Sequence, residues 1–147
     1  MINYRPVNPD DGPLIDFWIQ QDYWHKDKPA MLEFFMKPGC AILEDRQGPV
    51  MVVRFDDDPP KKVIIHIQFG AVSKYRIAKT LLGGFSSILM AFKDFGVEEA
   101  IFTSVNPELV ALCNKLGFKK VSEDAYCYQL TNDVSLSSRK ESCCVPS

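Results

Sequence analysis

The sequence predicts an α/β fold, and three stretches of the chain carry that prediction. Between residues 100 and 120, a short apolar run leads into a capped helix, a glycine and a second short run of β-formers. Residues 63–69 have the strongest β-strand character in the chain, which indicates a central strand. Residues 76–94 have the apolar spacing of a long amphipathic helix. Helices with one apolar face are expected to pack on a sheet formed by the strands.

The remaining elements follow from local patterns. Two further helices are expected, one after a cap at residues 10–13 and one at residues 29–36. Polar turns at residues 44–48 and 56–60 separate the strands of two hairpins. The other strands are short apolar runs, expected at residues 2–7, 40–43, 49–55, 118–122 and 125–131. The predicted order is one strand, two helices, three strands, then helix, strand, helix and two strands.

Length and composition are those of an ordinary globular domain. The 147 residues are 46% hydrophobic and 24% charged, which is enough for one core without disulfides or metals. The net charge is only −2 and the cations are scattered, so neither nucleic acid nor a membrane surface is predicted as a partner. Because no apolar run is long enough to span a bilayer and no basic leader precedes the first strand, a cytoplasmic protein is expected.

The five cysteines predict no cross-linked scaffold. Their number is odd, and the sequence has neither a Cys-x-x-Cys pair nor a nearby histidine at the spacing of a zinc ligand. Free thiols and no metal site are therefore expected.

The most informative segment is the helix that follows Asn106. Asn106 can cap it, Pro107 suits its first turn, and Gly117 allows a left-handed end. The apolar stripe that faces the sheet consists of Leu109, Leu112, Cys113 and Leu116. At this segment the chain resembles the GCN5-related N-acetyltransferase (GNAT) superfamily. The residues in register with the late motif of that family are Asn106, Leu112, Lys115, Leu116, Gly117 and Phe118.

Two positions depart from the motif: Leu109 replaces the usual alanine, and Cys113 stands where the family has tyrosine. The order of elements also agrees with the family over residues 2–131. The resemblance implies one GNAT-like domain at residues 1–131. Its sheet is expected to be mixed and mostly antiparallel, with six to seven strands, helices on both faces and a V-shaped splay between the fourth and fifth strands. Residues 132–147 are expected to be a tail with little intrinsic order.

The resemblance also implies a site for acetyl-CoA in that splay. In the family the pantetheine arm of coenzyme A bonds to the backbone of the central strand, which points here to Phe69, Gly70 and Ala71. Asn106 is expected near the same arm. The pyrophosphate is expected at the start of the long helix, where backbone amides and the helix dipole attract anions.

The phosphate loop of the family has Arg or Gln, two residues, Gly, one residue, and then Gly or Ala. Arg76 fits the first position and Ala78 lies within the loop, but Lys79 and Leu81 occupy the two positions of small residues. One interpretation is that Arg76 and Lys79 hold the phosphates by charge instead of through amides. The other is that these cations belong to a solvated helix start.

Acetyl transfer to an amine requires a base for the ammonium proton and an acid for the leaving thiolate. His66 is the best candidate for the base, because it shares a face of the central strand with Gln68 and titrates near neutrality. Its alternative is a hydrogen-bonded histidine on a half-buried face. By the resemblance, Cys113 is the candidate acid, and a buried structural cysteine is its alternative.

Tyr23, Trp24 and His25 follow the first helix, where members of the family place residues that contact substrate. They can line a pocket for a small-molecule or protein amine, or the aromatic residues can anchor the loop to the core. The expected function is acyl-CoA-dependent N-acyl transfer by direct attack. The alternative is an inactive or repurposed domain of the same fold that acts as a binding or structural component. Exposed edges of the closing strands also suit a homodimer.

Overall fold

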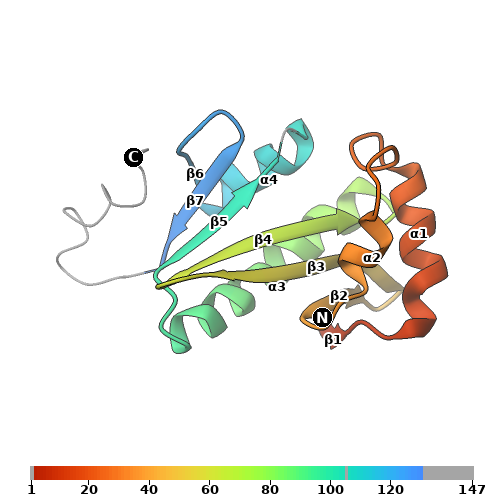
Figure 1. Cartoon of the computed structure of the whole chain (residues 1–147), viewed down its shortest axis with the longest axis horizontal. Coiled ribbons are helices and arrows are strands. Elements are labelled where there is room, and N and C mark those ends of the chain that lie inside the picture. Colours follow the sequence, from red (N-terminus) through yellow and green to blue (C-terminus); the bar gives the residue numbers. More distant parts are fainter. Residues whose placement is uncertain (1, 105, 131–147) are drawn as a thin grey trace. The chain divides into compact units, whose positions relative to one another are not determined.

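The computed structural model describes residues 2–104 and 106–130, and Figure 1 shows the course of the chain. Its contacts divide the chain into two compact units. The first unit comprises Met1–Phe55 and His66–Phe85, and the second comprises Asp56–Ile65 and the chain from Ser86 onward. The predicted tail at residues 132–147 lies outside the described residues, and the assignment of residues 1–131 to one domain stays a prediction.

Seven strands form one sheet in the order β1-β2-β3-β4-β5-β7-β6. Their bounds are Asn3–Pro6 (β1), Cys40–Asp45 (β2), Gly48–Asp58 (β3), Lys62–Phe69 (β4), Glu99–Thr103 (β5), Lys119–Lys120 (β6) and Ala125–Gln129 (β7). β4 and β5 are parallel, whereas β1–β2, β2–β3, β5–β7 and β6–β7 are antiparallel pairs. The structure confirms the mixed, mostly antiparallel sheet and the central place of β4.

The parallel pairing of β4 with β5 covers only the first half of β4. Its register runs from Lys62 opposite Glu99 to Ile65 opposite Phe102, while β4 itself continues to Phe69. The last four residues of β4 therefore lie beyond its described ladder with β5. This is the part of the sheet for which the family resemblance predicted a splay.

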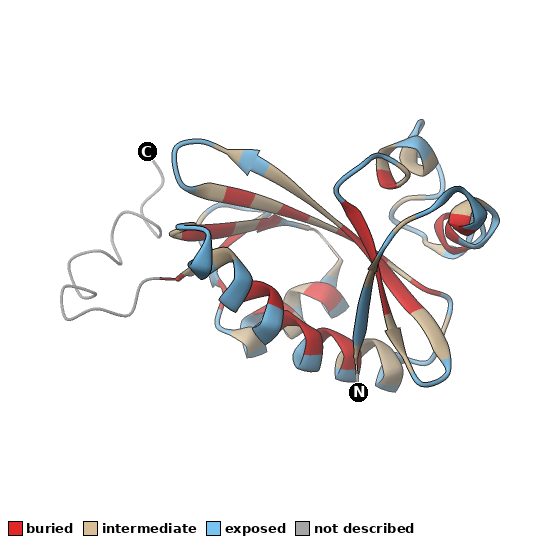
Figure 2. Cartoon of the chain, turned by 90° about the horizontal axis from the view of Figure 1, so that it is seen from below, coloured by how far each residue is buried: buried red, intermediate tan, exposed pale blue. Residues whose placement is uncertain are grey.

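In the first unit, helices lie on both sides of the strands, and Figure 2 shows the buried residues between them. α1 (Gly12–Gln21) and α2 (Met31–Phe35) pack on one face. The buried side chains of this layer are Ile15, Trp18, Ile19, Phe35, Cys40, Ile42 and Val52. Because side chains alternate along a strand, Leu43 lies on the other face, towards α3 (Lys74–Asp94). A Cβ added at Gly84 would lie 3.1 Å from Leu43, so this glycine permits the close approach of α3 to β2.

The hairpin of β2 and β3 is tighter and longer than predicted. Asp45 pairs with Gly48, so only Arg46 and Gln47 connect the strands. β3 continues to Asp58, and residues 56–58, which were predicted to lie in a polar loop, belong to the strand. The reason is that a neighbouring strand pairs with this segment and outweighs the low β propensity of aspartate.

Arg5 joins the first strand to the helices that follow. Its guanidinium donates to both carboxylate oxygens of Asp11, at 2.9 and 2.8 Å, and to Glu44 at 3.1 Å. The predicted cap of α1 is therefore only partly right. Asn8 caps the short 3-10 helix η1 (Pro9–Asp11), while Asp11 accepts from Arg5 and from the backbone N–H of Asn8. The hydrogen bond from Arg5 lowers the pKa of Asp11.

In the second unit, α4 (Pro107–Leu116) begins and ends as the sequence predicts. The side chain of Asn106 accepts a hydrogen bond from the backbone N–H of Glu108 at 3.0 Å. Gly117 ends the helix with a φ of 103°, a conformation that favours glycine. The closing pair of strands is shorter than expected, because only Lys119–Lys120 pair with β7.

Cysteine chemistry differs in part from the expectation. Cys40 and Cys113 are free and buried, but Cys127 is disulfide-bonded, so the expectation of free thiols is wrong for Cys127. The spacing rule tests nearby cysteines, whereas folding also brings distant ones together. Within residues 2–104 and 106–130, no helix is long and apolar enough to cross a membrane. In the same ranges, no group of three or more His, Cys, Asp or Glu side chains is placed to hold a metal ion.

Candidate functional site

Three polar side chains of the first unit, Asp22, His25 and Gln68, form a connected group that we name the histidine cluster. Gln68 lies near the end of β4 and is completely buried, with 0% of its surface exposed. Its Nε2 donates to Asp22 Oδ2 at 3.0 Å and to the carbonyl oxygen of Phe69 at 2.8 Å. Its Oε1 lies 2.6 Å from His25 Nδ1, which is also 3.3 Å from Asp22 Oδ2. The cluster joins the loop after α1 to the central strand.

The loop after α1 is folded around Asp22. The backbone N–H groups of His25 and Lys26 donate to the carbonyl oxygen of Asp22, at 3.1 and 2.8 Å. The N–H of Trp24 donates to Asp22 Oδ1 at 2.8 Å, in the manner of an Asx turn. Asp22 thus uses one carboxylate oxygen for its own turn and the other for His25 and Gln68. This turn places the imidazole of His25 beside the carboxylate.

The hydrogen bonds of Gln68 determine which nitrogen of His25 carries the proton. Nε2 of Gln68 faces two acceptors, so the amide has the orientation in which Oε1 faces His25. Because an amide oxygen only accepts, Nδ1 of His25 donates, and Nε2 of the neutral ring carries the free electron pair. No residue in the described part of the chain forms a hydrogen bond with that Nε2.

Opposing effects act on the pKa of His25. Burial lowers the pKa, but the hydrogen bonds of Asp22 and Gln68 and the charge of Asp22 outweigh burial, so the pKa lies above its ordinary value. Repulsion by the charge of Lys28 also lowers the pKa of His25. Burial likewise raises the pKa of Asp22, but the donors around it, His25 first among them, bring that pKa below its ordinary value. The pair therefore stabilises a protonated ring beside an ionised carboxylate.

Tyr23 and Trp24 lie next to His25 on the same loop. Tyr23 is 75% exposed and Trp24 is 37% exposed, and their rings meet edge to face with centroids 5.2 Å apart. The ammonium of Lys26 lies 5.9 Å from the centre of the Tyr23 ring. Trp18 of α1 is buried in the core. The two exposed rings offer aromatic faces to a cationic group in solution.

His66, the predicted base, is half-buried on β4 two residues before Gln68. Its ring meets Phe34 of α2 edge to face with centroids 4.8 Å apart. The guanidinium of Arg54 lies 3.9 Å from the centre of the Phe34 ring and donates to the carbonyl oxygen of Phe34 at 2.9 Å. The ring of His25 thus lies against a carboxylate and an amide, and the ring of His66 packs on the aromatic side chain of Phe34.

The segment after β4 is held by close packing within the first unit. The backbone N–H of Gly70 donates to the carbonyl oxygen of Val50 at 2.7 Å. A Cβ at Gly70 would lie 2.4 Å from that oxygen and 3.0 Å from the ring of Trp18, so only glycine fits. Of the predicted contacts to pantetheine, Phe69 is half-buried, Gly70 is buried and Ala71 is exposed.

Arg76, the predicted first residue of the phosphate loop, is bound by a carboxylate of the chain itself. Its Nε and NH2 donate to the two oxygens of Asp45 at 2.8 and 2.7 Å. This hydrogen bonding lowers the pKa of Asp45 to about 2. The guanidinium is thereby engaged by the turn between β2 and β3, and a phosphate would have to share it with Asp45.

Lys79 and Leu81, which replace the small residues of the family loop, point in opposite directions. Leu81 is completely buried and does not obstruct the helix start. Lys79 is exposed, and its ammonium lies 5.7 Å from the centre of the Tyr75 ring, one turn nearer the beginning of α3. Ala78 is half-buried. Lys79 has no carboxylate partner among the residues that the structure describes.

The two candidates of the second unit have structural contacts. Cys113 has 0% of its surface exposed, and burial raises the pKa of its thiol to about 12. Asn106 caps α4 with its side chain, and its backbone N–H donates to Ser104 Oγ at 2.9 Å. A thiol that is neither exposed nor acidic favours the structural alternative for Cys113.

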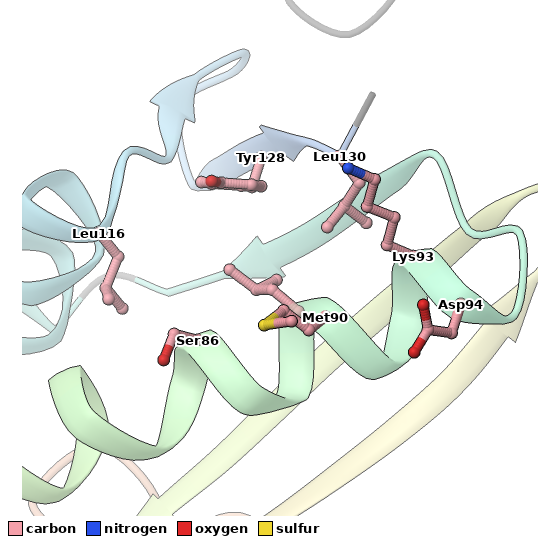
Figure 3. Close-up of a pocket in the computed structure, with 8 residues that line it drawn as sticks. Ser86, Met90, Lys93, Asp94, Leu116, Tyr128 and Leu130 are labelled. Atoms are coloured by element: carbon pink, nitrogen blue, oxygen red, sulfur yellow. The ribbon is translucent and has the colours of Figure 1, made fainter. Parts of the chain in front are cut away.

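A hollow of about 530 Å³ lies in the second unit, between α3 and β7 (Figure 3). Its lining residues are Ser86, Leu89, Met90, Lys93, Asp94, Leu116, Tyr128 and Leu130. The lining is mainly apolar, and its two charged residues are neighbours in the last turn of α3. None of the residues that the sequence singled out for chemistry lines it.

Sequence reasoning missed Asp22 and Gln68 as partners of His25, and Asp45 as the partner of Arg76. Two signals were present. Asp22 precedes His25 by three residues in a polar loop, a spacing that an Asx turn can close. Gln68 is a polar residue in a buried strand and must therefore be hydrogen-bonded. Asp45 and Arg76 are 31 residues apart, and only the fold brings them together.

No protein-family model and no curated protein sequence matches this chain. Solved structures do resemble it. An aminoglycoside 6'-acetyltransferase type Ii has a TM-score of 0.70 at 11% identity, over 90% of this chain and 99% of that one. A GCN5-related N-acetyltransferase from Kribbella flavida has a TM-score of 0.68 at 12% identity, over 87% and 97%.

N-acetylglutamate synthase from Neisseria gonorrhoeae, solved with coenzyme A and L-arginine, has a TM-score of 0.67 at 15% identity. The match covers 89% of this chain and 34% of the synthase. At these identities the likeness establishes the fold and not the activity. This chain has the GCN5-related N-acetyltransferase fold, as the segment after Asn106 and the order of elements predicted.

Proposed function

We propose that this protein is an acyl-CoA-dependent N-acyltransferase that transfers an acetyl group from acetyl-CoA to an amine by direct attack on the thioester. The histidine cluster carries the proposal. It holds an imidazole with a free Nε2 beside the end of β4, in a fold shared with acetyltransferases. A buried polar network is costly unless every member is hydrogen-bonded, and this one is well satisfied. Such a group is suited to proton transfer.

Charge supports the binding of the anionic part of acetyl-CoA at the start of α3. A helix N-terminus carries partial positive charge and normally attracts acidic side chains. The first turn of α3 has none, and Lys74, Arg76 and Lys79 lie in its first two turns. Cations at this position oppose the helix dipole unless an anion binds between them. We propose Lys79 and the first-turn amides as the main phosphate ligands, with Arg76 shared between phosphate and Asp45.

For the pantetheine arm we propose residues 69–71. The carbonyl oxygen of Phe69 already accepts a hydrogen bond from Gln68, and the N–H of Gly70 already donates one to Val50. Exposed Ala71 is therefore the residue of this segment whose backbone we expect to bind the arm. Asn106 stays a candidate by resemblance. When bound, acetyl-CoA supplies the activated acetyl group.

The absence of an accessible acid at Cys113 is compatible with this chemistry. A free thiol has a pKa of about 8.5, so a thiolate is a good leaving group near neutral pH and water can protonate it. The residues of this chain then have to supply only binding, orientation and a base.

A second candidate is an inactive or repurposed domain of the same fold. Two observations favour it: Lys79 and Leu81 replace small residues of the phosphate loop, and Cys113 is completely buried where the family has tyrosine. In that case the polar cluster stabilises the loop after α1 and does not take part in a reaction.

Thermal melting with and without acetyl-CoA separates the two candidates. A ligand at a hundred times its Kd adds about 2.7 kcal/mol of stability, so the enzyme is expected to melt at a clearly higher temperature with millimolar acetyl-CoA. Lys79→Ala should raise the Kd severalfold. Lys93→Ala, at the other end of the same helix, is the matched control and should leave the Kd within twofold.

Release of the coenzyme A thiol in the presence of a panel of amines tests the transfer itself. Thiol release that depends on an amine supports the enzyme. No melting shift together with no amine-dependent release would leave the repurposed domain as the better account. The class of amine, a homodimer, the lack of nucleic-acid and membrane partners and a cytoplasmic location stay predictions.

A further inference from the structure

We infer that His25, and not His66, is the general base of the acyl transfer, and that Asp22 and Gln68 are positioning residues that present its free nitrogen to the acceptor amine. The inference rests on the proposed function and names the residue that removes the proton. Its evidence is the geometry of the histidine cluster.

The ring of His25 is fixed through one nitrogen, Nδ1. Nδ1 lies 2.6 Å from the amide oxygen of Gln68 and 3.3 Å from the carboxylate of Asp22. Gln68 cannot move to follow a rotating ring, because it is completely buried and its own Nε2 is held at two acceptors. Donation from Nδ1 therefore fixes both the tautomer and the plane of the imidazole.

The other ring nitrogen of His25, Nε2, is left for a substrate. The ring nitrogens of imidazole point in divergent directions, so Nε2 faces away from Gln68. The side chain of His25 keeps 21% of its surface exposed, and no described residue bonds to Nε2. Tyr23 and Trp24 beside it offer exposed rings, which attract a cationic amine.

The proposed proton transfer and acyl transfer balance as follows for an amine acceptor. The acceptor arrives as an ammonium ion, and Nε2 of His25 takes one of its protons. The nitrogen lone pair then forms a bond to the thioester carbon, the carbon–sulfur bond breaks, and its electron pair leaves on sulfur. A second proton from the attacking nitrogen neutralises the thiolate through water, and His25 returns its proton to solvent. The sum is one amide, one thiol and one released proton.

His66 is less suited to this role. Its ring packs against Phe34, and the guanidinium of Arg54 lies 3.9 Å from the centre of that same ring. His25 faces the carboxylate of Asp22, which stabilises the imidazolium that a base must become. The other charged group that acts on His25 is Lys28 of its own loop.

Because the chain has only two histidines, NMR can follow both rings directly. In the wild type, one ring is expected to show the tautomer protonated at Nδ1 and a pKa above the ordinary histidine value. His25→Gln should remove that signal and leave the other. Asp22→Asn should lower the pKa, whereas Asp27→Asn, in the same loop but exposed and without a described partner, should not. Signals of another tautomer at His25 would overturn the inference.

Kinetics provide the second readout. For wild type, kcat/KM for an accepted amine should rise with pH and level off with an inflection at the pKa that NMR gives for His25. His25→Gln should lower kcat/KM by about 10²- to 10⁴-fold and abolish the inflection. Asp22→Asn should move the inflection to lower pH in step with the NMR value. Should His25→Gln fail to fold, the Asp22→Asn pair of measurements decides alone.

The outcomes separate the inference from the function on which it rests. If His66→Gln removes the inflection and His25→Gln keeps it, the inference is overturned while the acyltransferase stands. If the wild type neither binds acetyl-CoA nor acylates any amine, both fail together. Coincidence of the NMR and kinetic pKa values, lost in His25→Gln, supports both.

Discussion

The loop after α1 and the helix α4 differ in whether a family motif in the sequence coincides with polar side chains that are available for chemistry. α4 has the cap, apolar stripe and terminal glycine that resemble the GNAT family, yet Cys113 is completely buried and Asn106 is used as a cap. The loop after α1 has no family motif, yet Asp22 and His25 form a mostly buried polar group with Gln68 of β4. The motif that resembles the family and the residues that we propose for proton transfer therefore lie in different units.

A physical reason explains this difference. A cap, a stripe and a left-handed glycine are what any helix needs in order to begin, pack on a sheet and end. They persist in a fold whether or not the protein is an enzyme. An imidazole held by a buried amide and a carboxylate is not needed for packing, so its presence says more about function.

The largest effect is expected at Gly70, directly after β4. Gly70→Ala should destabilise the protein by about 3 kcal/mol or more, because the added Cβ would lie 2.4 Å from the carbonyl oxygen of Val50. Gly12→Ala is the control: its Cβ would lie 3.8 Å from Met36 at a helical φ of −52°, but Pro13 follows it, so a change within about 1 kcal/mol is expected. Urea unfolding measures both. Equal stability of the two variants would contradict the packing described here.

A smaller effect is expected at the end of α4. Gly117→Ala should cost about 1–2 kcal/mol, because φ is 103° there. The added Cβ would also lie 3.1 Å from the ring of Tyr128. Gly96→Ala has a similar φ of 81° with nothing within 4 Å, so it isolates the backbone cost in the same unit. Thermal melting should place Gly117→Ala below Gly96→Ala; the opposite order would remove Tyr128 from the account.

Substitution of the buried thiol tests whether α4 is only structural. Cys113→Ala should cost about 1 kcal/mol of stability through lost packing. Cys113→Ser should cost more, by about 1–3 kcal/mol, because a hydroxyl in this fully buried place lacks a partner. Chemical unfolding provides the comparison. A serine variant as stable as wild type would mean that the site admits water.

The smallest effect is the pH dependence of stability through Asp22 and His25. Because the pKa of Asp22 is lowered in the folded state, its ionised carboxylate stabilises the fold above the ordinary aspartate pKa. This stabilisation is lost as pH falls through the folded pKa. Because the pKa of His25 is raised in the folded state, its protonated ring stabilises the fold below the ordinary histidine pKa. This stabilisation is lost as pH rises through the folded pKa. The stability difference between wild type and Asp22→Asn should therefore be largest between about pH 4 and 6.5. Asp27→Asn should show no such maximum in urea unfolding, and a flat difference for Asp22→Asn would contradict the ion pair.

The sequence predicted the order of elements, the central place of β4 and both ends of α4, because these depend on local patterns. It failed at residues 56–58, where pairing with a neighbouring strand outweighs the low β propensity of aspartate. It selected His66 as the candidate base because His66 shares a strand face with Gln68 and a histidine titrates near neutrality. Gln68, the partner of His25 on β4, and Asp45, the partner of Arg76, lie 43 and 31 residues away, respectively, and no local pattern reports which residue such a distant partner is.

The most direct test compares one residue from each region in one assay. Amine-dependent release of coenzyme A thiol from acetyl-CoA is measured for wild type, His25→Gln and Cys113→Ala at equal concentrations of folded protein. We expect His25→Gln to lose at least about a hundredfold in rate and Cys113→Ala to stay close to wild type. A large loss in Cys113→Ala with full activity in His25→Gln would contradict the account and move the chemistry to α4.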